Sequence, residues 1–223
     1  MAAFVITIDG PAASGKSTAA KLLAQKLDAD YLDTGAMYRA VTLAAMQSGI
    51  DIKNEEKLRN LIDKTKIEFD VREGKSAVFV NGTEVTTHIR KPEVTANVRY
   101  IASVPQLRRK LVEMQRKFAD EHEKIVTEGR DQGTVAFPDA NVKFFLTADE
   151  NERARRRQSQ PILEGGGGSF KEIRKAIRQR DNTDENRPAG PLKPADDAVI
   201  IDTTSLNIEQ VVDRLLSFVK RII

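Results

Sequence analysis

Two glycines five positions apart, followed by a lysine and a serine, form the strongest chemical signal in this chain. The segment Gly10 to Ser17 reads Gly-Pro-Ala-Ala-Ser-Gly-Lys-Ser and follows the apolar run Phe4 to Ile8. A loop between a strand and the start of a helix can turn its backbone N–H groups toward an anion at the positive end of the helix dipole. The pattern therefore predicts a phosphate-binding loop made of Gly10, Pro11, Ala12, Ala13, Ser14, Gly15, Lys16, Ser17 and Thr18.

Lys16 and Ser17 have separate predicted roles in binding a nucleoside triphosphate. A lysine at this point of the loop reaches the outer phosphates, and the hydroxyl of the next residue is a ligand for Mg²⁺. We therefore expect Mg²⁺ as the cofactor, with Ser17 as its protein ligand. The chain lacks the Asn-Lys-x-Asp segment that is expected to read the base in a GTPase, which favours a small kinase.

Predicted strands and helices alternate along most of the chain and position this loop. Apolar runs indicate strands at 4–8, 124–127, 142–146 and 198–201, and helical spacing indicates helices over 16–27, 36–47, 105–122 and 208–219. Between about 64 and 90 the apolar period changes to two, and Asn81-Gly82 is a strong hairpin signal. The sequence therefore predicts an α/β fold with a parallel sheet and a small antiparallel insert.

The composition excludes several other kinds of site. With no cysteine and two histidines among 223 residues, the chain has no disulfide, thiolate metal site or thiol nucleophile and little material for a histidine metal site. A net charge of +3 with 5% aromatic residues is weak evidence for nucleic acid. Neither a bilayer-spanning stretch nor a signal peptide is visible. We therefore expect a cytoplasmic protein with no nucleic-acid or membrane partner.

Several segments, in order along the chain, together resemble the bacterial cytidylate kinases. They are the loop above, Leu-Asp-Thr-Gly-Ala-Met-Tyr-Arg at 32–39, Glu-Gly-Arg-Asp at 128–131, the arginine-rich segment 152–157, and Arg180 with Asp184 and Arg187. The resemblance implies a P-loop kinase fold, with a central parallel sheet flanked by helices. It places the core at 1–62 and 96–223, a short lid at about 154–170, and a monophosphate-binding insert at 63–95.

The resemblance also implies an activity and a set of site residues. The expected reaction moves the γ-phosphoryl group of ATP to CMP or dCMP, giving ADP and CDP or dCDP, in a monomeric enzyme. A carboxylate suits cytosine because its 4-amino group donates a hydrogen bond that uracil cannot give. The resemblance assigns CMP to Thr34, Arg39, Arg108, Arg130, Asp131, Arg180 and Asp184, and catalysis to Lys16, Arg130, Arg153, Arg157 and Arg187.

Two positions depart from the family pattern. Arg99 stands where the family usually has a serine that helps to hold the base, and its guanidinium could donate to the cytosine carbonyl or turn to solvent. Gln132 stands at a usually apolar position and affects local packing. We interpret the run Gly165 to Gly168 as a mobile loop. Two other functions stay open, a P-loop kinase for another small acceptor and an ATP-binding module without transfer.

Overall fold

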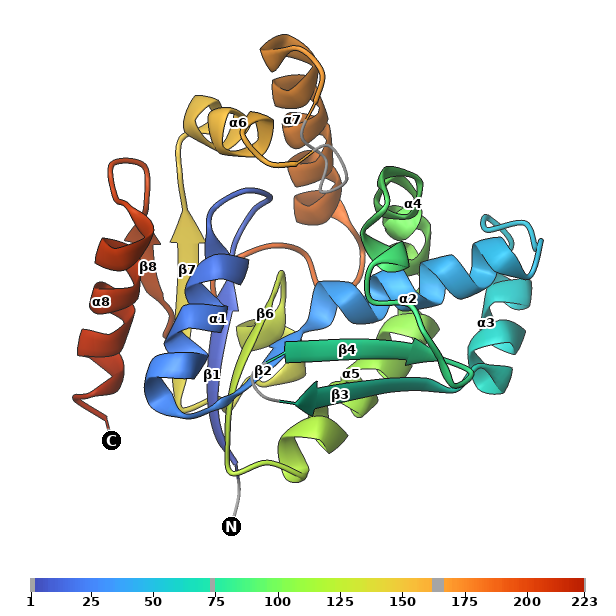
Figure 1. Ribbon diagram of the computed structural model, residues 1–223, viewed down its shortest axis with the longest axis horizontal. Coiled ribbons are helices and arrows are strands. Elements are labelled where there is room, and N and C mark those ends of the chain that lie inside the picture. The colour runs from blue at the N-terminus through green and yellow to red at the C-terminus, as the bar shows by residue number, and fades with distance from the viewer. Residues whose placement is uncertain (1–2, 73–74, 162–166, 223) are drawn as a thin grey trace.

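The computed structural model describes residues 3–72, 75–161 and 167–222, and its centre is a parallel β-sheet (Figure 1). The strand order is β2-β6-β1-β7-β8, and each pair of neighbours runs parallel. The strands are β1 (Phe4–Asp9), β2 (Asp30–Asp33), β6 (Lys124–Gly129), β7 (Val142–Thr147) and β8 (Val199–Asp202). The parallel sheet predicted from the sequence is confirmed.

Helices cover both faces of this sheet, because alternate strand residues point to opposite sides. Val5 and Ile125 belong to the apolar cluster formed with α2 (Thr34–Gln47) and α5 (Pro105–Asp120). Their neighbours Ile6 and Val126 belong to the cluster formed with α1 (Lys16–Leu27) and α8 (Ile208–Val219). Because β1 and β6 are covered by apolar clusters on both faces, their charged residues near the site lie at the carboxyl ends of the strands.

The helix predictions agree with the structure to within a few residues. Helix α1 has the predicted bounds, and α5 ends at Asp120, two residues before the predicted end. Leu107 and Leu111 of the predicted apolar stripe are fully buried. Within the described parts of the chain, no helix has both the length and the apolar character needed to cross a bilayer.

A second, antiparallel sheet lies beside α2 and α3 (Glu55–Lys64), on the right of Figure 1. Its strands are β3 (Ile67–Arg72), β4 (Lys75–Val80) and β5 (Thr83–Glu84), in that order. Asn81 and Gly82 have φ values of +50° and +80°, which suits the tight turn between β4 and β5. The chain then passes through the short helix η1 (His88–Arg90) into α4 (Pro92–Ser103). The antiparallel element is confirmed, whereas the division of the chain at 63–95 stays a prediction.

Helices α6 (Glu150–Gln158) and α7 (Phe170–Asn186) lie side by side above the sheet (Figure 1). The Glu150 carboxylate joins them, accepting hydrogen bonds from Arg174 Nε at 2.5 Å and Arg178 Nε at 2.9 Å. The predicted lid at about 154–170 begins in α6. Residues 162–166, and with them half of the predicted loop Gly165 to Gly168, lie outside the described residues.

The carboxyl ends of three adjacent strands bring polar residues together. Asp33 ends β2, Glu128 and Gly129 end β6, and Asp9 ends β1. In the parallel register Asp33 lies opposite Glu128, and Asp9 lies opposite Gly129. Ligands of open α/β sheets bind at this edge, so these residues mark the expected position of a ligand site.

Candidate active site

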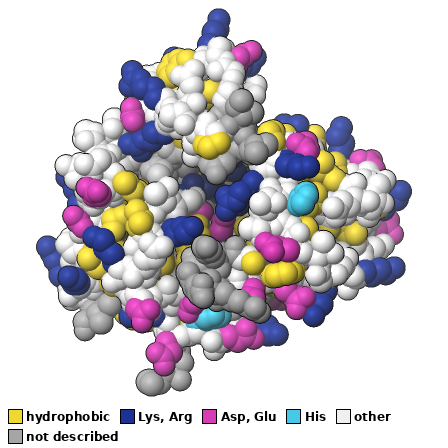
Figure 2. Space-filling model, viewed as in Figure 1, with side chains coloured by type: hydrophobic (Ala, Val, Ile, Leu, Met, Phe, Trp, Pro, Cys, Tyr) yellow, Lys and Arg dark blue, Asp and Glu magenta, His cyan; other side chains and the backbone are white. Residues whose placement is uncertain are grey.

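A cavity of about 730 Å³ opens above the carboxyl ends of the central strands. Figure 2 shows Lys and Arg side chains gathered in the hollow at the middle of this face. Among the described residues that line the cavity, eight are lysine or arginine and four are aspartate or glutamate, a difference of four positive charges. Such a surplus of cations favours anionic ligands.

The P-loop runs from the end of β1 to the first turn of α1. Gly10 has a φ of +152°, and a Cβ there would overlap the carbonyl of Leu146 in β7, so no other residue fits. Gly15, with a φ of +90°, precedes α1 in the left-handed region. Helix α1 has neither a side-chain cap nor an acidic residue in its first turn. Its first N–H groups are therefore available to an anion.

Lys16 lies at the floor of the cavity and is 5% exposed. Its Nζ donates to the carbonyl of Pro11 at 3.0 Å. Burial, assisted by the nearby Arg130, lowers the pKa of Lys16 to about 7, although Glu128 acts in the opposite direction. Because this buried ammonium donates to a carbonyl and not to a carboxylate, the negative charge of an arriving phosphate would stabilise its protonated form.

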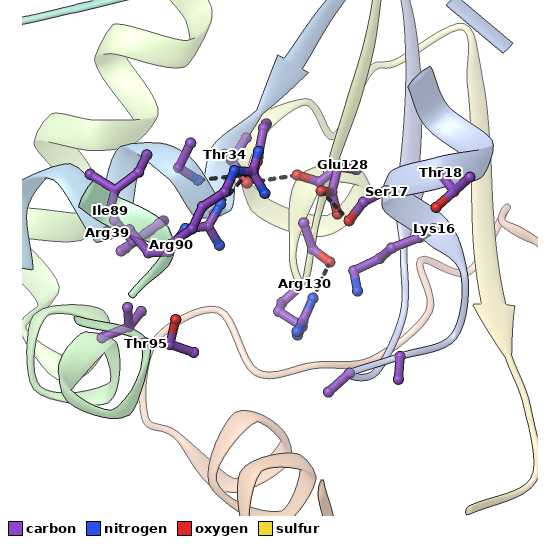
Figure 3. A pocket seen from close by; sticks show the side chains of 18 of the residues that line it. Lys16, Ser17, Thr18, Thr34, Arg39, Ile89, Arg90, Thr95, Glu128 and Arg130 are labelled. Carbon is purple, nitrogen blue, oxygen red and sulfur yellow. Dashed lines mark hydrogen bonds and ion pairs between the residues drawn. The ribbon is translucent and has the colours of Figure 1, made fainter. Parts of the chain in front are cut away.

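Glu128 links the P-loop to the start of α2 (Figure 3). Its Oε1 accepts hydrogen bonds from Ser17 Oγ at 2.6 Å and from the Tyr31 hydroxyl at 3.2 Å. The Thr34 hydroxyl donates to its main-chain carbonyl at 2.7 Å. Burial and Glu128 raise the pKa of Tyr31 well above its ordinary value, so this phenol stays a hydrogen-bond donor.

Asp33 orients two arginines toward the same wall. Its Oδ1 accepts from the N–H of Ala36 at 2.9 Å and so caps α2, while its Oδ2 accepts from Arg39 Nη2 at 2.9 Å. Arg90 Nη2 lies 3.7 Å from the same oxygen, and Figure 3 shows Arg39 and Arg90 together. Burial opposes ionisation, but Arg39 and then Arg90 hold the pKa of Asp33 below its usual value.

A buried arginine–carboxylate pair closes the far end of the cavity. Arg108 Nη2 donates to Asp131 Oδ2, and each residue is 4% exposed. Arg187 Nη2 lies 3.5 Å from Asp131 Oδ1, and the Arg108 guanidinium stands 5.5 Å from the centre of the Tyr38 ring. A Cβ on Gly190 would overlap both partners of the pair. The pair is thus enclosed on several sides and held rigidly.

Arg130, Arg180 and Asp184 stand between the P-loop and this pair, and all three line the cavity. Arg130 Nε donates to Asp184 Oδ2 at 2.8 Å and its Nη1 donates to the carbonyl of Gly129 at 3.1 Å. Burial, followed by the charge of Arg130, lowers the pKa of Arg180 to about 10. Neighbouring cations that repel one another in this way are stabilised by a bound polyanion.

Arg153 and Arg157, two of the predicted catalytic arginines, occupy different places. Arg153 is buried behind the P-loop, where its Nε donates to the carbonyl of Ala148 at 3.0 Å and its Nη1 donates to the carbonyl of Ala12 at 3.2 Å. The same Nη1 also binds the Asp181 carboxylate of α7. Arg153 does not line the cavity, whereas Arg157 does.

A second cavity, of about 330 Å³, adjoins the other side of the P-loop. Arg156 lines it together with Gly15 and Asn207. The Arg156 guanidinium is held by Glu152 at 3.2 Å and by the hydroxyl of Thr203 at 2.9 Å. The P-loop therefore separates two spaces, each with a cationic side chain.

The structure brings most of the predicted site residues to the large cavity. Those that line it are Ala12, Ala13, Gly15, Lys16, Ser17, Thr18, Thr34, Arg39, Arg130, Asp131, Arg157, Arg180, Asp184 and Arg187. Those outside its lining are Gly10, Pro11, Ser14, Arg108 and Arg153. Arg108 still reaches the site through Asp131, whereas Arg153 supports the P-loop from behind.

Glu128, Arg90 and Thr95 are among the cavity-lining residues that sequence reasoning missed. Glu128 belongs to the quoted Glu-Gly-Arg-Asp segment, and its position at the end of a buried strand is the signal that could have identified it. Arg90 and Thr95 follow the antiparallel sheet and carry no local motif. Arg99 is outside the cavity lining, with its guanidinium against the Tyr100 ring and 3.0 Å from the Tyr100 hydroxyl.

Comparison with known proteins agrees with this geometry. A family model described as cytidylate kinase matches residues 6–221. Cytidylate kinases of Anoxybacillus flavithermus and Bacillus cereus are 47% and 46% identical to this chain, each over 96% of this chain and 95% of its own length.

Solved structures with low sequence identity share the fold. A shikimate kinase from Bacteroides thetaiotaomicron has a TM-score of 0.50 at 16% identity, and an uncharacterized protein from Eubacterium ventriosum has 0.52 at 13%. Each match covers 97% of this chain and 98% of the other. These matches confirm the expected P-loop kinase fold. With a family model that spans nearly its whole length and relatives close to half identical, the chain belongs to the cytidylate kinase family.

Proposed function

We propose that this enzyme transfers the γ-phosphoryl group of ATP to CMP and also to dCMP, giving ADP and CDP or dCDP. The observation that carries the proposal is the buried pair of Arg108 and Asp131 at the end of the cavity whose floor is Lys16. A module that only bound ATP would need the P-loop but no second group of cations. Arg39, Arg130 and this pair form such a second site.

ATP occupies the P-loop side in this proposal. The N–H groups at the start of α1 and the Lys16 ammonium bind its outer phosphates. Its base lies in the second cavity beside Arg156, whose planar guanidinium is already fixed by Thr203. Arg157 lines the large cavity close to the loop and approaches the phosphates from α6.

CMP occupies the acceptor side. Asp131 accepts a hydrogen bond from the cytosine 4-amino group, and Arg108 holds the carboxylate in place. UMP presents an oxygen at that point, so two acceptors would face each other and the carboxylate would receive no hydrogen bond from the base. The phosphate of CMP is bound by Thr34, Arg39 and Arg130. The sugar side is contacted by Arg180 and Asp184.

The transfer needs no dedicated base. An oxygen of the CMP phosphate attacks the γ-phosphorus in line, the bond to the ADP oxygen breaks, and the released charge stays on ADP. A phosphate monoester oxygen is already ionised near neutral pH. The work of the protein is therefore to align two polyanions and to stabilise their charge, through Lys16, Arg130 and Arg187.

The residues near the P-loop suit Mg²⁺. Ser17 Oγ and Glu128 Oε1 lie 2.6 Å apart, and hydroxyl and carboxylate oxygens are the donors that Mg²⁺ prefers. Within the described residues, no group of three or more His, Cys, Asp or Glu could hold a metal by itself, which agrees with an ion held largely by substrate phosphates and water. When bound, Mg²⁺ neutralises charge on those phosphates. Ser17 would hold it directly and Glu128 would orient the serine.

We also propose that the enzyme works as a cytoplasmic monomer on free nucleotides and not on nucleic acid. The support is that one chain supplies the walls of both cavities, and that a site of about 730 Å³ suits small molecules.

A coupled assay of ADP release tests the proposed function. Mg·ATP is offered with CMP, dCMP, UMP, AMP or GMP, and Lys16→Met is assayed beside the natural enzyme. We expect strong turnover of CMP and dCMP, weak turnover of UMP, and loss of activity in the variant. Absence of turnover with all five acceptors would refute the assignment of CMP.

A further inference from the structure

A buried carboxylate lies directly behind the acceptor end of the cavity. Asp9 ends β1 and is 4% exposed. Its two oxygens each accept one main-chain hydrogen bond, Oδ1 from the N–H of Gln132 at 2.9 Å and Oδ2 from the N–H of Gly133 at 2.8 Å. The residue before Gln132 is Asp131, and the residue after Asp9 is the first glycine of the P-loop. Asp9 therefore joins the chain segments of both substrate sites.

The side chain of Gln132 is fixed by a second set of contacts. Its Oε1 accepts from Thr127 Oγ1 at 2.9 Å and its Nε2 donates to Gln115 Oε1 at 3.3 Å. All three of these side chains are at most 1% exposed. The amide also lies close to the main chain of β6, because a Cβ on Gly129 would come within 2.8 Å of Gln132 Cγ. Gln132 is thus held by β6, α5 and β1 at once.

The main chain at this point has an unusual conformation. Residues Gln132–Ala136 form a single wide turn, η2, in which the N–H of Ala136 donates to the carbonyl of Asp131 at 3.2 Å and that of Phe137 to the carbonyl of Gln132 at 2.7 Å. Such i to i+5 turns are rare and occur often at functional sites. A wide turn has weaker local restraints than an α-helix, so external hydrogen bonds must fix its first residue.

We propose that Asp9 and Gln132 are positioning residues, which hold Asp131 in register with the P-loop and so set the selectivity for the acceptor base. The inference rests on the proposed function, in which Asp131 reads cytosine. Neither residue lines the cavity, so both act through the main chain next to Asp131. Because Gly10 packs tightly against β7, the P-loop and the Asp131 carboxylate are fixed by one set of buried contacts. We call this set, formed by Asp9 and by Gln132 with its partners Thr127 and Gln115, the frame.

Asp9 is a titratable residue within this frame. Burial raises the pKa of Asp9 to about 7, with Asp131 adding to the shift and Arg130 and the two N–H groups opposing it. The side chains of Thr7 and Lys143 pack against Gly133 on the same side. A protonated Asp9 is a weaker acceptor for the two N–H groups. The hold on Asp131 therefore weakens as pH falls below about 7.

Gln132→Met provides the first test, because methionine retains the length of the side chain and loses the amide. The measured quantity is kcat/KM for CMP divided by kcat/KM for UMP. Since both acceptors carry the same phosphate, this ratio cancels effects on phosphate binding and on ATP. We expect the ratio to fall about tenfold, as for the loss of one or two buried hydrogen bonds, with the KM for ATP changed less than about twofold.

Val219→Ala is the matched control. Val219 is fully buried near the end of α8, in the cluster on the opposite face of the sheet. This variant loses core packing without touching the frame, so its CMP to UMP ratio should equal that of the natural enzyme. An equal fall in both variants would mean that the ratio follows general stability, and the proposal would be wrong.

Asp9→Asn supplies an independent readout. In the natural enzyme we expect the CMP to UMP ratio to rise between pH 6 and 8, around the pKa of Asp9. In the variant we expect this ratio to be low and independent of pH. If Asp9→Asn does not fold, Gln132→Met decides alone. A ratio that Gln132→Met leaves unchanged, in a natural enzyme that prefers CMP, overturns the proposal. A natural enzyme without CMP turnover overturns the proposed function instead.

Discussion

Binding of ATP should draw a proton onto Lys16. In the free protein burial and Arg130 lower the pKa of Lys16 to about 7. Phosphates that arrive at Nζ provide the opposite charge and raise that pKa again. With a pKa of about 7, the lysine is protonated in about half of the molecules at pH 7 and in about one tenth at pH 8. Full protonation in the complex then requires uptake of about 0.5 proton at pH 7 and about 0.9 proton at pH 8.

Titration calorimetry measures this uptake directly. ATP is titrated into the enzyme at pH 8 in two buffers with different enthalpies of ionisation, and the slope of the observed enthalpy against the buffer enthalpy is the number of protons taken up. The terminal phosphate of ATP is itself ionised at this pH, because such groups have a pKa of about 6. A slope close to one therefore reports on the protein.

Two variants make the assignment specific. Lys16→Met should remove the uptake. Lys26→Met makes the same change of charge in the same helix, at a half-exposed side chain that lies 3.0 Å from Asp213, and should keep it. A natural enzyme with zero slope at pH 8, or a Lys16→Met variant with an unchanged slope, would refute the reasoning.

The same shift has a defined sign for stability. Because the pKa of Lys16 is about 7 in the folded protein and 10.5 in the unfolded chain, the unfolded chain binds more protons between these pH values. The Lys16 contribution therefore makes the free protein more stable as pH rises through this window, and the benefit is complete above the upper value. Urea unfolding at about pH 7 and pH 9, compared with Lys16→Met, should show this difference.

Three further substitutions test other parts of the site. Asp131→Asn should narrow the preference for CMP over UMP by about tenfold or more while the KM for ATP changes little, and equal losses for every acceptor would show that Asp131 does not read the base. Glu128→Gln should lower kcat by about tenfold to a hundredfold and raise the Mg²⁺ concentration needed for half activity, and an unchanged Mg²⁺ titration would exclude this carboxylate from the metal site. Arg153→Met leaves Asp181 buried without its partner, so urea unfolding should show a loss of about 3–5 kcal/mol, whereas normal stability with lost turnover would place Arg153 on ATP.

The sequence predicts the parts of the site that depend on local order along the chain. The P-loop is recognisable because Gly10, Gly15 and Lys16 act through the conformation of their own segment. Helices α1 and α8 are equally local, because one apolar face defines each. These elements agree with the structure almost residue for residue.

Contacts that depend on which strands are neighbours could not be predicted in this way. Glu128 meets Ser17 because β6 lies beside β1, an order that the sequence does not reveal. Arg153 lies six residues after the end of β7 in the sequence, but its partner Asp181 lies in α7. Gln132 stood out as a departure from the family pattern, yet its hydrogen bonds to Thr127 and Gln115 follow only from the packing of η2 against β6 and α5.

The acidic residues of the site explain how a cavity for two polyanions tolerates carboxylates. Three carboxylates at or next to the cavity accept hydrogen bonds from the protein: Asp33 from Ala36 and Arg39, Asp184 from Arg130, and Asp9 from two main-chain N–H groups. These carboxylates orient the cations and the turn that carries Asp131, and their charge is largely neutralised before a substrate arrives. The remaining positive charge faces the cavity. Binding of phosphate and recognition of the base therefore both depend on buried contacts at the strand ends, but on different residues, so the preference for CMP can change while the KM for ATP changes little.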